Sequence, residues 1–219
     1  MARKHVQIQD SEVEFPADVQ LVSTTDLRGV ITYANPLALV KPLKIQEREL
    51  SWLTTEQISE LLQVIRDRCD NPHVEIITLI CLATGARWSE AEKLKPTGLR
   101  NGVITFSGTK SGKVRSVPIT AELEAKIRQH WKQHGQPNVA ITSFRRALAK
   151  TSIQLPKGQA AHSLRHTFAS HFIQNGGNIL TLQKILGHSS LAMTMRYAHL
   201  APDHLQDAVR LNPLSSLCL

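Results

Sequence analysis

Apolar residues recur at helical spacing over most of the chain after residue 52. Four of them follow at i, i+3, i+4 and i+7 and predict a helix with one buried stripe: Ile58, Leu61, Leu62 and Ile65. Thr54 and Gln57 form a capping box that sets the start of this helix. Asn71-Pro72 predicts the start of a second helix, and Gly85 predicts its end.

The rest of the chain shows more helical segments and one pair of strands. Helices are expected, most of them after a Ser, Thr, Asn or Asp cap, near residues 89–94, 120–134, 143–150, 163–174, 178–186, 190–197 and 203–210. Strands are expected at residues 102–107 and 114–119, joined by a glycine-flanked turn at 108–112. The sequence therefore predicts an α+β fold that is mostly α-helical and has one small antiparallel β-sheet.

The first 50 residues have a different pattern. The run QLVSTTDLRGVITYAN predicts two short strands around a turn at Asp26–Gly29, and Asn35-Pro36 and Lys41-Pro42 then interrupt the chain. We expect residues 1–35 to be a fragment that is disordered or not autonomous, because they cannot bury a core alone. Residues 36–51 are interpreted as a linker, and residues 52–219 as the main domain.

Composition narrows the class of protein. The chain has 219 residues, of which 42% are hydrophobic, so wholesale disorder is excluded. Its longest apolar run, Ile76 to Ala83, is far shorter than the roughly 18 residues that span a membrane. No secretory signal is recognisable at the start, and the three cysteines form no CxxC pair. These features favour a cytoplasmic protein without a disulfide scaffold or a cysteine-based zinc site.

Positive charge is concentrated in the second half of the chain. The formal net charge is +8, and residues 125–202 contain ten Lys or Arg residues and no acidic residue. A long stretch without carboxylates is suited to a surface that contacts phosphates, which indicates a nucleic-acid partner. A solvated basic face on an ordinary enzyme is the alternative.

Two basic residues lie at bends where they can reach an anion. Arg87 follows the helix-ending glycine in GARWSE, and its planar guanidinium suits two phosphate oxygens. Lys110 lies at the predicted hairpin tip between two glycines, where it could enter a DNA groove or donate a proton to a leaving oxygen. Taken singly, each could equally be a solvated surface residue.

The segment HSLRHTFASH places several histidines near one arginine. If Ser163 caps the helix, His162 lies just before its first turn, and His162 and Arg165 are neighbours at that end and make a plausible phosphate site. His166 and His171 are interpreted as structural, hydrogen-bonded histidines. The pairs at i, i+4, His162/His166 and His130/His134, lack the glutamate of an HExxH zinc motif, so a metal site is not favoured.

A last motif, LGHSSLAMTMRYAHL, contains His188 in a turn and Tyr197 nine residues later. In combination with GARWSE and HSLRHTFASH it resembles the catalytic domain of tyrosine recombinases, the phage integrase family, over residues 52–210. The family pattern is Arg, Lys, His-x-x-Arg, His, Tyr. This chain supplies every position: Arg87, Lys110, His162, Arg165, His188 and Tyr197.

The resemblance implies a DNA breaking–rejoining fold and a mechanism. Tyr197 would attack a DNA phosphate and form a 3′-phosphotyrosyl link, with His162 as the base or its positioner. Arg87, Arg165 and His188 would hold the phosphate, and Lys110 would protonate the leaving 5′-oxygen. Double-stranded DNA is the implied partner, bound by a tetramer on paired sites. No cofactor or metal is implied, and the chain contains no P-loop motif.

The chain departs from the family before residue 53. Full-length relatives carry a helical core-binding domain there, and residues 35–52 resemble only its tail and the linker. Residues 20–35 resemble the first strands of a PAS sensor domain of the aerotaxis-receptor type, although a random hairpin extension is an equal alternative. We interpret the chain as a hybrid reading frame whose integrase is truncated and whose activity is impaired.

Three other functions stay open at this point. The first is a DNA-binding remnant that no longer recombines. The second is a type IB topoisomerase-like nicking enzyme. The spacing between the LGHSS motif and the tyrosine favours the recombinase over this alternative. The third is a PAS-type sensor, for which residues 1–35 are too short.

Overall fold

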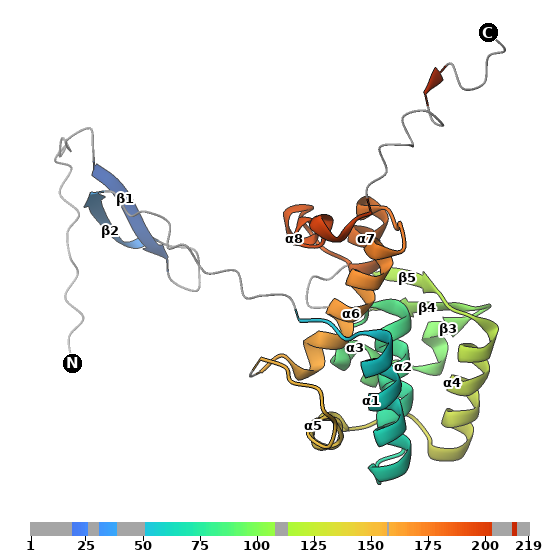
Figure 1. Cartoon of the computed structure of the whole chain (residues 1–219). Helices are drawn as coiled ribbons and strands as arrows, with labels where there is room; N and C mark the ends of the chain where they lie inside the picture. The colour runs from blue at the N-terminus through green and yellow to red at the C-terminus, as the bar shows by residue number, and fades with distance from the viewer. Residues whose placement is uncertain are drawn as a thin grey trace, which may run out of the picture. The chain divides into compact units, whose positions relative to one another are not determined.

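The computed structural model describes residues 19–25, 31–38, 51–107, 114–156, 158–202 and 212–213 (Figure 1). The chain divides into two units, residues 1–49 and 50–219. In the first unit, β1 (Val19–Thr25) pairs antiparallel with β2 (Ile31–Ala38). Both strands agree with the sequence pattern, but β2 continues through Asn35-Pro36, which the pattern treats as an interruption.

Three predictions fall on residues that lie outside the described ranges. They are the turn at 26–29, the hairpin tip at 108–112 with Lys110, and the helix at 203–210.

The second unit is mostly helical. Its helices are α1 (Thr55–Arg68), α2 (His73–Thr84), α3 (Trp88–Glu92), α4 (Ala121–His134), α5 (Ile141–Leu148), α6 (Ala160–Gln174), α7 (Ile179–Leu186) and α8 (Ala192–Met195). Two short 3₁₀ turns, η1 (Pro96–Gly98) and η2 (Ala198–Leu200), accompany them.

Local signals explain several of the helix ends. The backbone N–H of Gln57 donates to Thr54 Oγ1 at 3.3 Å, and the Gln57 side chain accepts from the Thr54 N–H at 3.0 Å, which confirms the capping box. Gly85 ends α2 with a left-handed φ of 63°. Side-chain caps are also present at Thr120 and Asn178, but not at the starts of α5, α6 and α8.

Two helices of the second half differ from the prediction. Helix α6 begins at Ala160, so Ser163 is inside the helix, and its hydroxyl donates to the Ala160 carbonyl at 2.8 Å. His162 therefore belongs to the first turn and does not precede it. Helix α8 is only Ala192–Met195, and Tyr197 lies just beyond it. The predicted helix at residues 190–197 is therefore too long, because the chain forms turns on both sides of α8.

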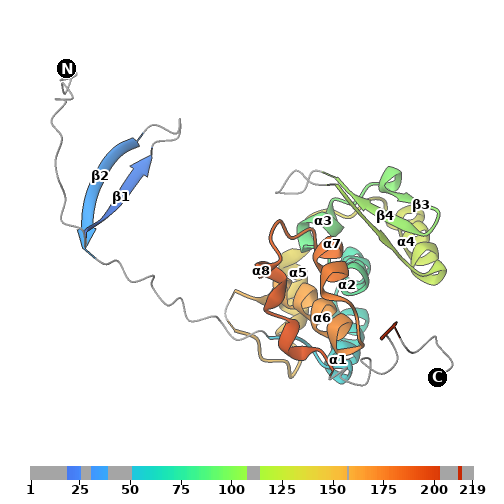
Figure 2. The ribbon, with the colours of Figure 1, turned by 90° about the horizontal axis from the view of Figure 1, so that it is seen from above.

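A small antiparallel sheet contains β3 (Leu99–Arg100), β4 (Val103–Phe106) and β5 (Arg115–Pro118) in that order. The predicted pair is confirmed, and β3 adds a short edge strand. The sheet lies beside α4 in Figure 2. Glu124 of α4 accepts a hydrogen bond from the Gly102 N–H at 2.7 Å, and this contact ties the helix to the turn between β3 and β4.

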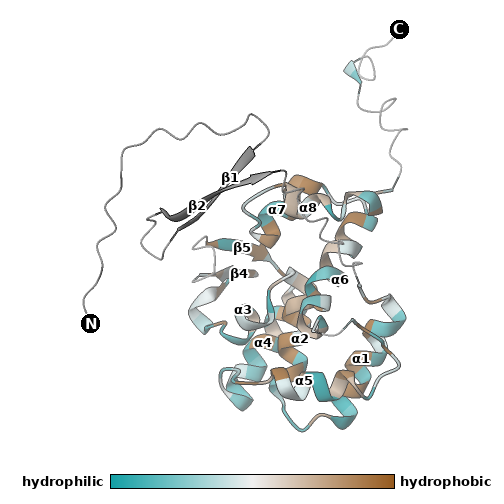
Figure 3. Ribbon diagram, turned by 90° about the vertical axis from the view of Figure 1, so that its left-hand side faces the viewer, coloured by the Kyte–Doolittle hydropathy of each residue, from teal (hydrophilic) through white to brown (hydrophobic). Residues whose placement is uncertain are grey.

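Helix α2 forms the centre of the main core. It is apolar on almost every side, as its brown colour in Figure 3 shows, and it packs against α1, α3, α4, α5 and α6. A second cluster joins α6 and α7 and includes Leu182, Leu186 and Tyr197. Within the described residues, no helix is long and apolar enough to cross a membrane.

Candidate active site

Arg87 lies in the turn between α2 and α3, where it is the N-terminal cap residue of α3. Its backbone N–H donates to Glu90 Oε2 at 2.8 Å, and its Nη1 donates to Glu90 Oε1 at 2.9 Å. The Arg87 side chain keeps 32% of its surface exposed. One face of the guanidinium is thus held by the protein while the rest can meet an anion.

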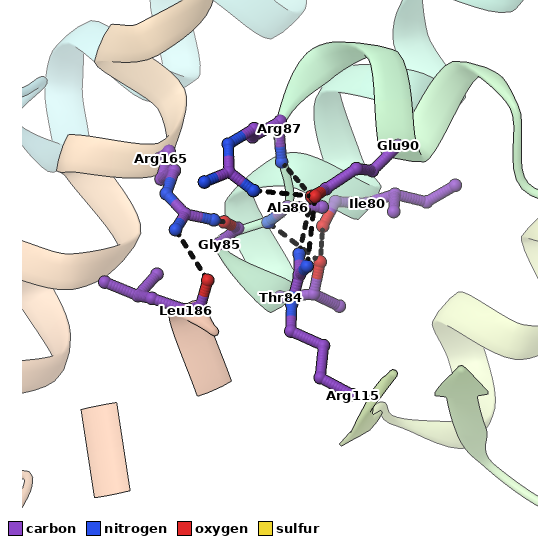
Figure 4. A network of polar contacts seen from close by, with 9 residues as sticks. All are labelled: Ile80, Thr84, Gly85, Ala86, Arg87, Glu90, Arg115, Arg165 and Leu186. Atoms are coloured by element: carbon purple, nitrogen blue, oxygen red, sulfur yellow. Dashed lines mark hydrogen bonds and ion pairs between the residues drawn. The ribbon is translucent and has the colours of Figure 1, made fainter. Parts of the chain in front are cut away.

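Glu90 also binds a second arginine, Arg115 of β5. Arg115 donates through Nη1 at 3.1 Å and through Nη2 at 2.6 Å to the two carboxylate oxygens, as Figure 4 shows. Burial raises the pKa of Glu90, but hydrogen bonds from Arg115 and Arg87 outweigh burial and hold this pKa at about 2. The charged carboxylate therefore ties the sheet to the turn that carries Arg87.

Arg165 projects from α6 toward the same turn. Its Nη1 donates to the Gly85 carbonyl at 2.7 Å, and its Nη2 donates to the Leu186 carbonyl at 2.6 Å (Figure 4). Burial, together with the charges of Arg87 and Arg115, lowers the pKa of Arg165 to about 10, so the group stays charged at neutral pH. These two bonds connect α6 with the ends of α2 and α7.

His188 lies in the turn after α7. Gly187 ends that helix with a φ of 66°, and a Cβ at Gly187 would lie 3.3 Å from Arg115 Cδ. His188 Nδ1 lies 2.9 Å from the Thr194 hydroxyl. Burial and the nearby charges of Arg165 and Arg87 lower the pKa of His188 to about 4, which keeps the ring neutral at pH 7.

Tyr197 is 2% exposed, and its hydroxyl lies 2.6 Å from His166 Nδ1. Burial raises the pKa of Tyr197, while the charges of Arg196 and Arg165 oppose that rise. His162 is exposed on the first turn of α6. His166 of the next turn, interpreted from the sequence as a structural histidine, makes the contact with the tyrosine hydroxyl.

Four of the six predicted residues form one cluster, in which their charges influence one another: Arg87, Arg165, His188 and Tyr197. His162 lies on the same helix end as Arg165, and its charge lowers the pKa of His166. Lys110 lies outside the described residues. His171 has a structural contact, since its Nε2 donates to the Leu53 carbonyl at 2.8 Å.

Neither Glu90 nor Arg115 is among the residues that the sequence motifs predict for the site. Glu90 stands three residues after Arg87, the position of the acidic partner in a capping box, so its contact with the turn had a local signal. Arg115 had a weaker signal, because it occupies an inward position of β5, in alternation with Val117. An arginine on the buried face of a strand requires a partner carboxylate.

Two open grooves flank this arginine–glutamate network. One, with a volume of about 550 Å³, is lined by residues that include Arg87, Lys93 and Lys95. The other, with a volume of about 470 Å³, is lined by residues that include Lys184 and His188. Basic residues thus continue on both sides of the cluster, along surfaces that an extended anion can follow.

A further pair of histidines joins α2 and α4. His73 Nδ1 lies 2.9 Å from His130 Nε2, within hydrogen-bond distance. Within the described ranges, no group of three or more His, Cys, Asp or Glu residues could hold a metal ion.

Comparison with known proteins places these residues in a family. The model of the phage integrase family matches residues 51–204. The integrase of Escherichia phage 186 is 53% identical over 180 residues, which cover 82% of this chain and 53% of the relative. The tyrosine recombinase XerA of Pyrococcus furiosus is 33% identical and covers 75% of this chain and 63% of the relative.

A solved structure agrees with the same range. The catalytic domain of bacteriophage HP1 integrase is 52% identical, with a TM-score of 0.71, and the match covers 78% of this chain and all of that domain. The chain spans about half the length of the curated phage relatives it matches. The comparisons do not support the PAS interpretation of residues 20–35. The match of the family model over residues 51–204 and the likeness to a solved catalytic domain show that the chain belongs to the phage integrase family.

Proposed function

We propose that this protein is a site-specific recombinase that cleaves and rejoins duplex DNA through a 3′-phosphotyrosyl intermediate. One observation carries the proposal: Arg87, Arg165, His188 and Tyr197 come from distant segments and converge on one cluster. That cluster has two guanidiniums, a neutral imidazole and a phenol. This is the set of groups that transfer of a phosphoryl group to tyrosine requires.

The two arginines bind the scissile phosphate. Glu90 holds Arg87 and two backbone carbonyls hold Arg165, so both guanidiniums are oriented before DNA arrives. Their charges stabilise the negative charge that develops on the non-bridging oxygens during the attack. His188, whose Nδ1 contacts Thr194, has Nε2 to offer to the same phosphate.

The remaining steps concern the attacking and leaving oxygens. Tyr197 attacks phosphorus, and the 5′-oxygen leaves with a proton from Lys110. His162, which is exposed on the first turn of α6, takes the proton of Tyr197 or positions the group that does. The phosphotyrosyl ester keeps the energy of the broken bond, so the 5′-hydroxyl of a second strand can reverse the step.

The charge distribution supports duplex DNA as the partner. Residues 125–202 contain ten basic and no acidic residues, and the two grooves beside the cluster are lined by further lysines. We propose that protomers assemble as tetramers on paired DNA sites and act at the nucleoid.

A covalent trapping experiment tests this function. The protein is incubated with a pool of nicked duplexes of randomised sequence, stopped with SDS and examined for a protein–DNA band. We expect a band in the wild type and in Tyr33→Phe, and none in Tyr197→Phe. Tyr33 is the matched control because the chain has only two tyrosines.

Sequencing of the trapped DNA then gives the preferred site. A wild type that binds the pool in a salt-dependent way but forms no band contradicts the proposal and favours a DNA-binding remnant. A band that survives Tyr197→Phe contradicts the assignment of the nucleophile.

A further inference from the structure

Arg115 is a buried cation that touches three elements around the site. Its side chain extends from β5 and is 5% exposed, and its guanidinium carbon lies 4.6 Å from the centroid of the Phe106 ring on β4. Both of its Nη atoms donate to Glu90 of α3 (Figure 4). A Cβ at Gly187, which ends α7, would lie 3.3 Å from Arg115 Cδ and 3.9 Å from its Nη1. Arg115 therefore packs between β4, α3 and the turn after α7.

The carboxylate of Glu90 is shared evenly between two arginines. Its Oε1 accepts from Nη1 of Arg87 and from Nη1 of Arg115. Its Oε2 accepts from the backbone N–H of Arg87 and from Nη2 of Arg115. These four bonds fix the plane of the carboxylate, because each arginine holds both of its oxygens. A displacement of the Arg115 guanidinium is therefore passed on to Arg87, the proposed phosphate ligand.

The same side chain lies against a second turn of the proposed phosphate site. Gly187 directly precedes His188, and the missing Cβ of this glycine lets the Arg115 stem approach the turn. Arg115, Gly187 and His188 line one groove. Arg115 thus contacts both the partner of Arg87 and the residue next to His188, although these two phosphate ligands come from distant parts of the chain.

Arg115 is not itself available as a phosphate ligand. Its side chain is only 5% exposed, and both terminal nitrogens are bound to Glu90. Its Nε is buried and lacks a hydrogen-bond partner among the residues that the structure describes. An unpaired buried N–H is unfavourable, and a methionine of similar length would fill the space without this cost. An arginine at this position is explained by a need for its rigid fork, which binds two oxygens at once.

We propose that Arg115 is a positioning residue that sets the distance between Arg87 and His188, so that both reach the same scissile phosphate. It acts on Arg87 through Glu90 and on His188 through its contact with Gly187. A misplacement of about 1 Å can slow an enzymatic step about 100-fold, so a small displacement of this fork is enough to affect cleavage. This inference rests on the proposed strand-transfer function.

The test uses Arg115→Lys, which keeps the positive charge but removes the fork. An ammonium is a point charge, so it cannot hold both oxygens of Glu90 in the directions that Arg115 does. Arg128→Lys is the matched control. Arg128 donates through Nε at 2.8 Å and through Nη2 at 2.6 Å to Glu124 Oε1, and its side chain is 51% exposed. Cleavage under single-turnover conditions and DNA affinity are measured on the nicked duplex most enriched in the trapping experiment.

We expect Arg115→Lys to cleave at least about 10-fold more slowly than the wild type at saturating DNA, with its affinity for the duplex changed by less than about threefold. Arg128→Lys should match the wild type in both quantities. Circular dichroism and urea titrations identify a temperature at which every variant is folded, and the cleavage rates are compared there.

Double variants separate positioning from a general loss of stability. A residue that acts through another loses its effect when that other residue is absent. Adding Arg115→Lys to Arg87→Ala, or to His188→Ala, should therefore slow cleavage by at most about one third of the factor that it causes in the wild type.

A second substrate carries a methylphosphonate at the scissile position. A methyl group there replaces one non-bridging oxygen and removes the negative charge, so the orientation of Arg87 matters less. The ratio between the wild-type rate and the Arg115→Lys rate should shrink at least about threefold on this substrate. A loss of stability alone would leave this ratio unchanged.

Three results overturn the proposal. They are an Arg115→Lys rate within about threefold of the wild type, an equal effect of the change in all three backgrounds, or an unchanged ratio on the methylphosphonate. If Arg115→Lys does not fold, Phe106→Leu replaces it under the same criteria, because it removes the ring beneath the guanidinium and leaves every charge in place. Absence of the trapped band in the wild type overturns the proposed function itself, whereas a non-additive defect confined to these variants supports this inference.

Discussion

Glu90 links Arg87 to the sheet, because the same carboxylate binds Arg87 and Arg115 of β5. It accepts hydrogen bonds from Arg87 and Arg115, and its side chain is only 10% exposed. A buried carboxylate that faces two guanidiniums stabilises them only while it is charged. The same bonds that raise the stability of the fold therefore hold Arg87, the proposed phosphate ligand, in place.

Replacing Glu90 by Gln tests this role. The change keeps the shape of the side chain but leaves two cations facing a neutral amide, so we expect the free energy of unfolding to fall by about 2–4 kcal/mol in urea titrations. Arg87 loses its orientation, and the trapping rate falls while Tyr197 is untouched.

Glu75→Gln is the matched control. Glu75 pairs with Arg66 at 2.7 Å, but the two side chains are 35% and 46% exposed, so its loss should cost less than about 1 kcal/mol. Equal losses in the two variants would show that the Glu90 network adds nothing beyond a surface ion pair.

At the scale of elements, the end of α2 is the point where the site is assembled. Gly85 has a left-handed backbone there, and its carbonyl binds Arg165 of α6. A Cβ at Gly85 would lie 2.6 Å from Phe168 Cδ1 and 2.7 Å from Leu186 Cδ2. The glycine therefore permits both the turn and the close approach of α6 and α7.

Gly85→Ala should destabilise the protein by about 2–4 kcal/mol, because left-handed strain of about 1–2 kcal/mol is added to overpacking. Gly187→Ala is the matched control, since Gly187 also ends a helix at a φ of 66° but the nearest atom to an added Cβ is Arg115 Cδ at 3.3 Å, in a flexible side chain. Thermal and urea unfolding should rank Gly85→Ala as the more damaging change. The reverse order would argue against the importance of close packing at Gly85.

For the whole molecule, neutral histidines in the interior make stability depend on pH. Burial is the largest cause that lowers the pKa of His130, His166 and His188 to about 4 from an ordinary value of 6.5. The folded protein thus binds fewer protons than the unfolded chain between these two values. The stability that these neutral histidines contribute is fully present above about pH 6.5. It is lost as the pH falls toward 4.

We expect the thermal midpoint to drop by about 5 °C or more between pH 7 and pH 4.5. The His130→Gln variant should show a smaller drop, because its amide can replace Nε2 as the partner of His73 but does not titrate. The charges of His73 and His134 lower the pKa of His130 further, while Glu75 opposes them. His199→Gln, an exposed control, should keep the full wild-type dependence. A midpoint that does not change with pH would contradict this account.

Short-range signals in the sequence predict most of the elements and indicate the family. Capping at Thr54, the helix stop at Gly85 and the small antiparallel pair follow from interactions between residues that are near one another in the chain. The motifs around Arg87, Arg165, His188 and Tyr197 indicated the family in the same way, because each is read from a short segment.

Tertiary structure decided which side chains meet. The bond between Arg115 and Glu90 spans 25 residues, and the bond between His166 and Tyr197 spans 31. No local pattern encodes such pairs, since they depend on how α6, α7 and the sheet pack around α2. For this reason the sequence does not predict the contact between His166 and Tyr197, which arises from the packing of α6 against the turn after α8.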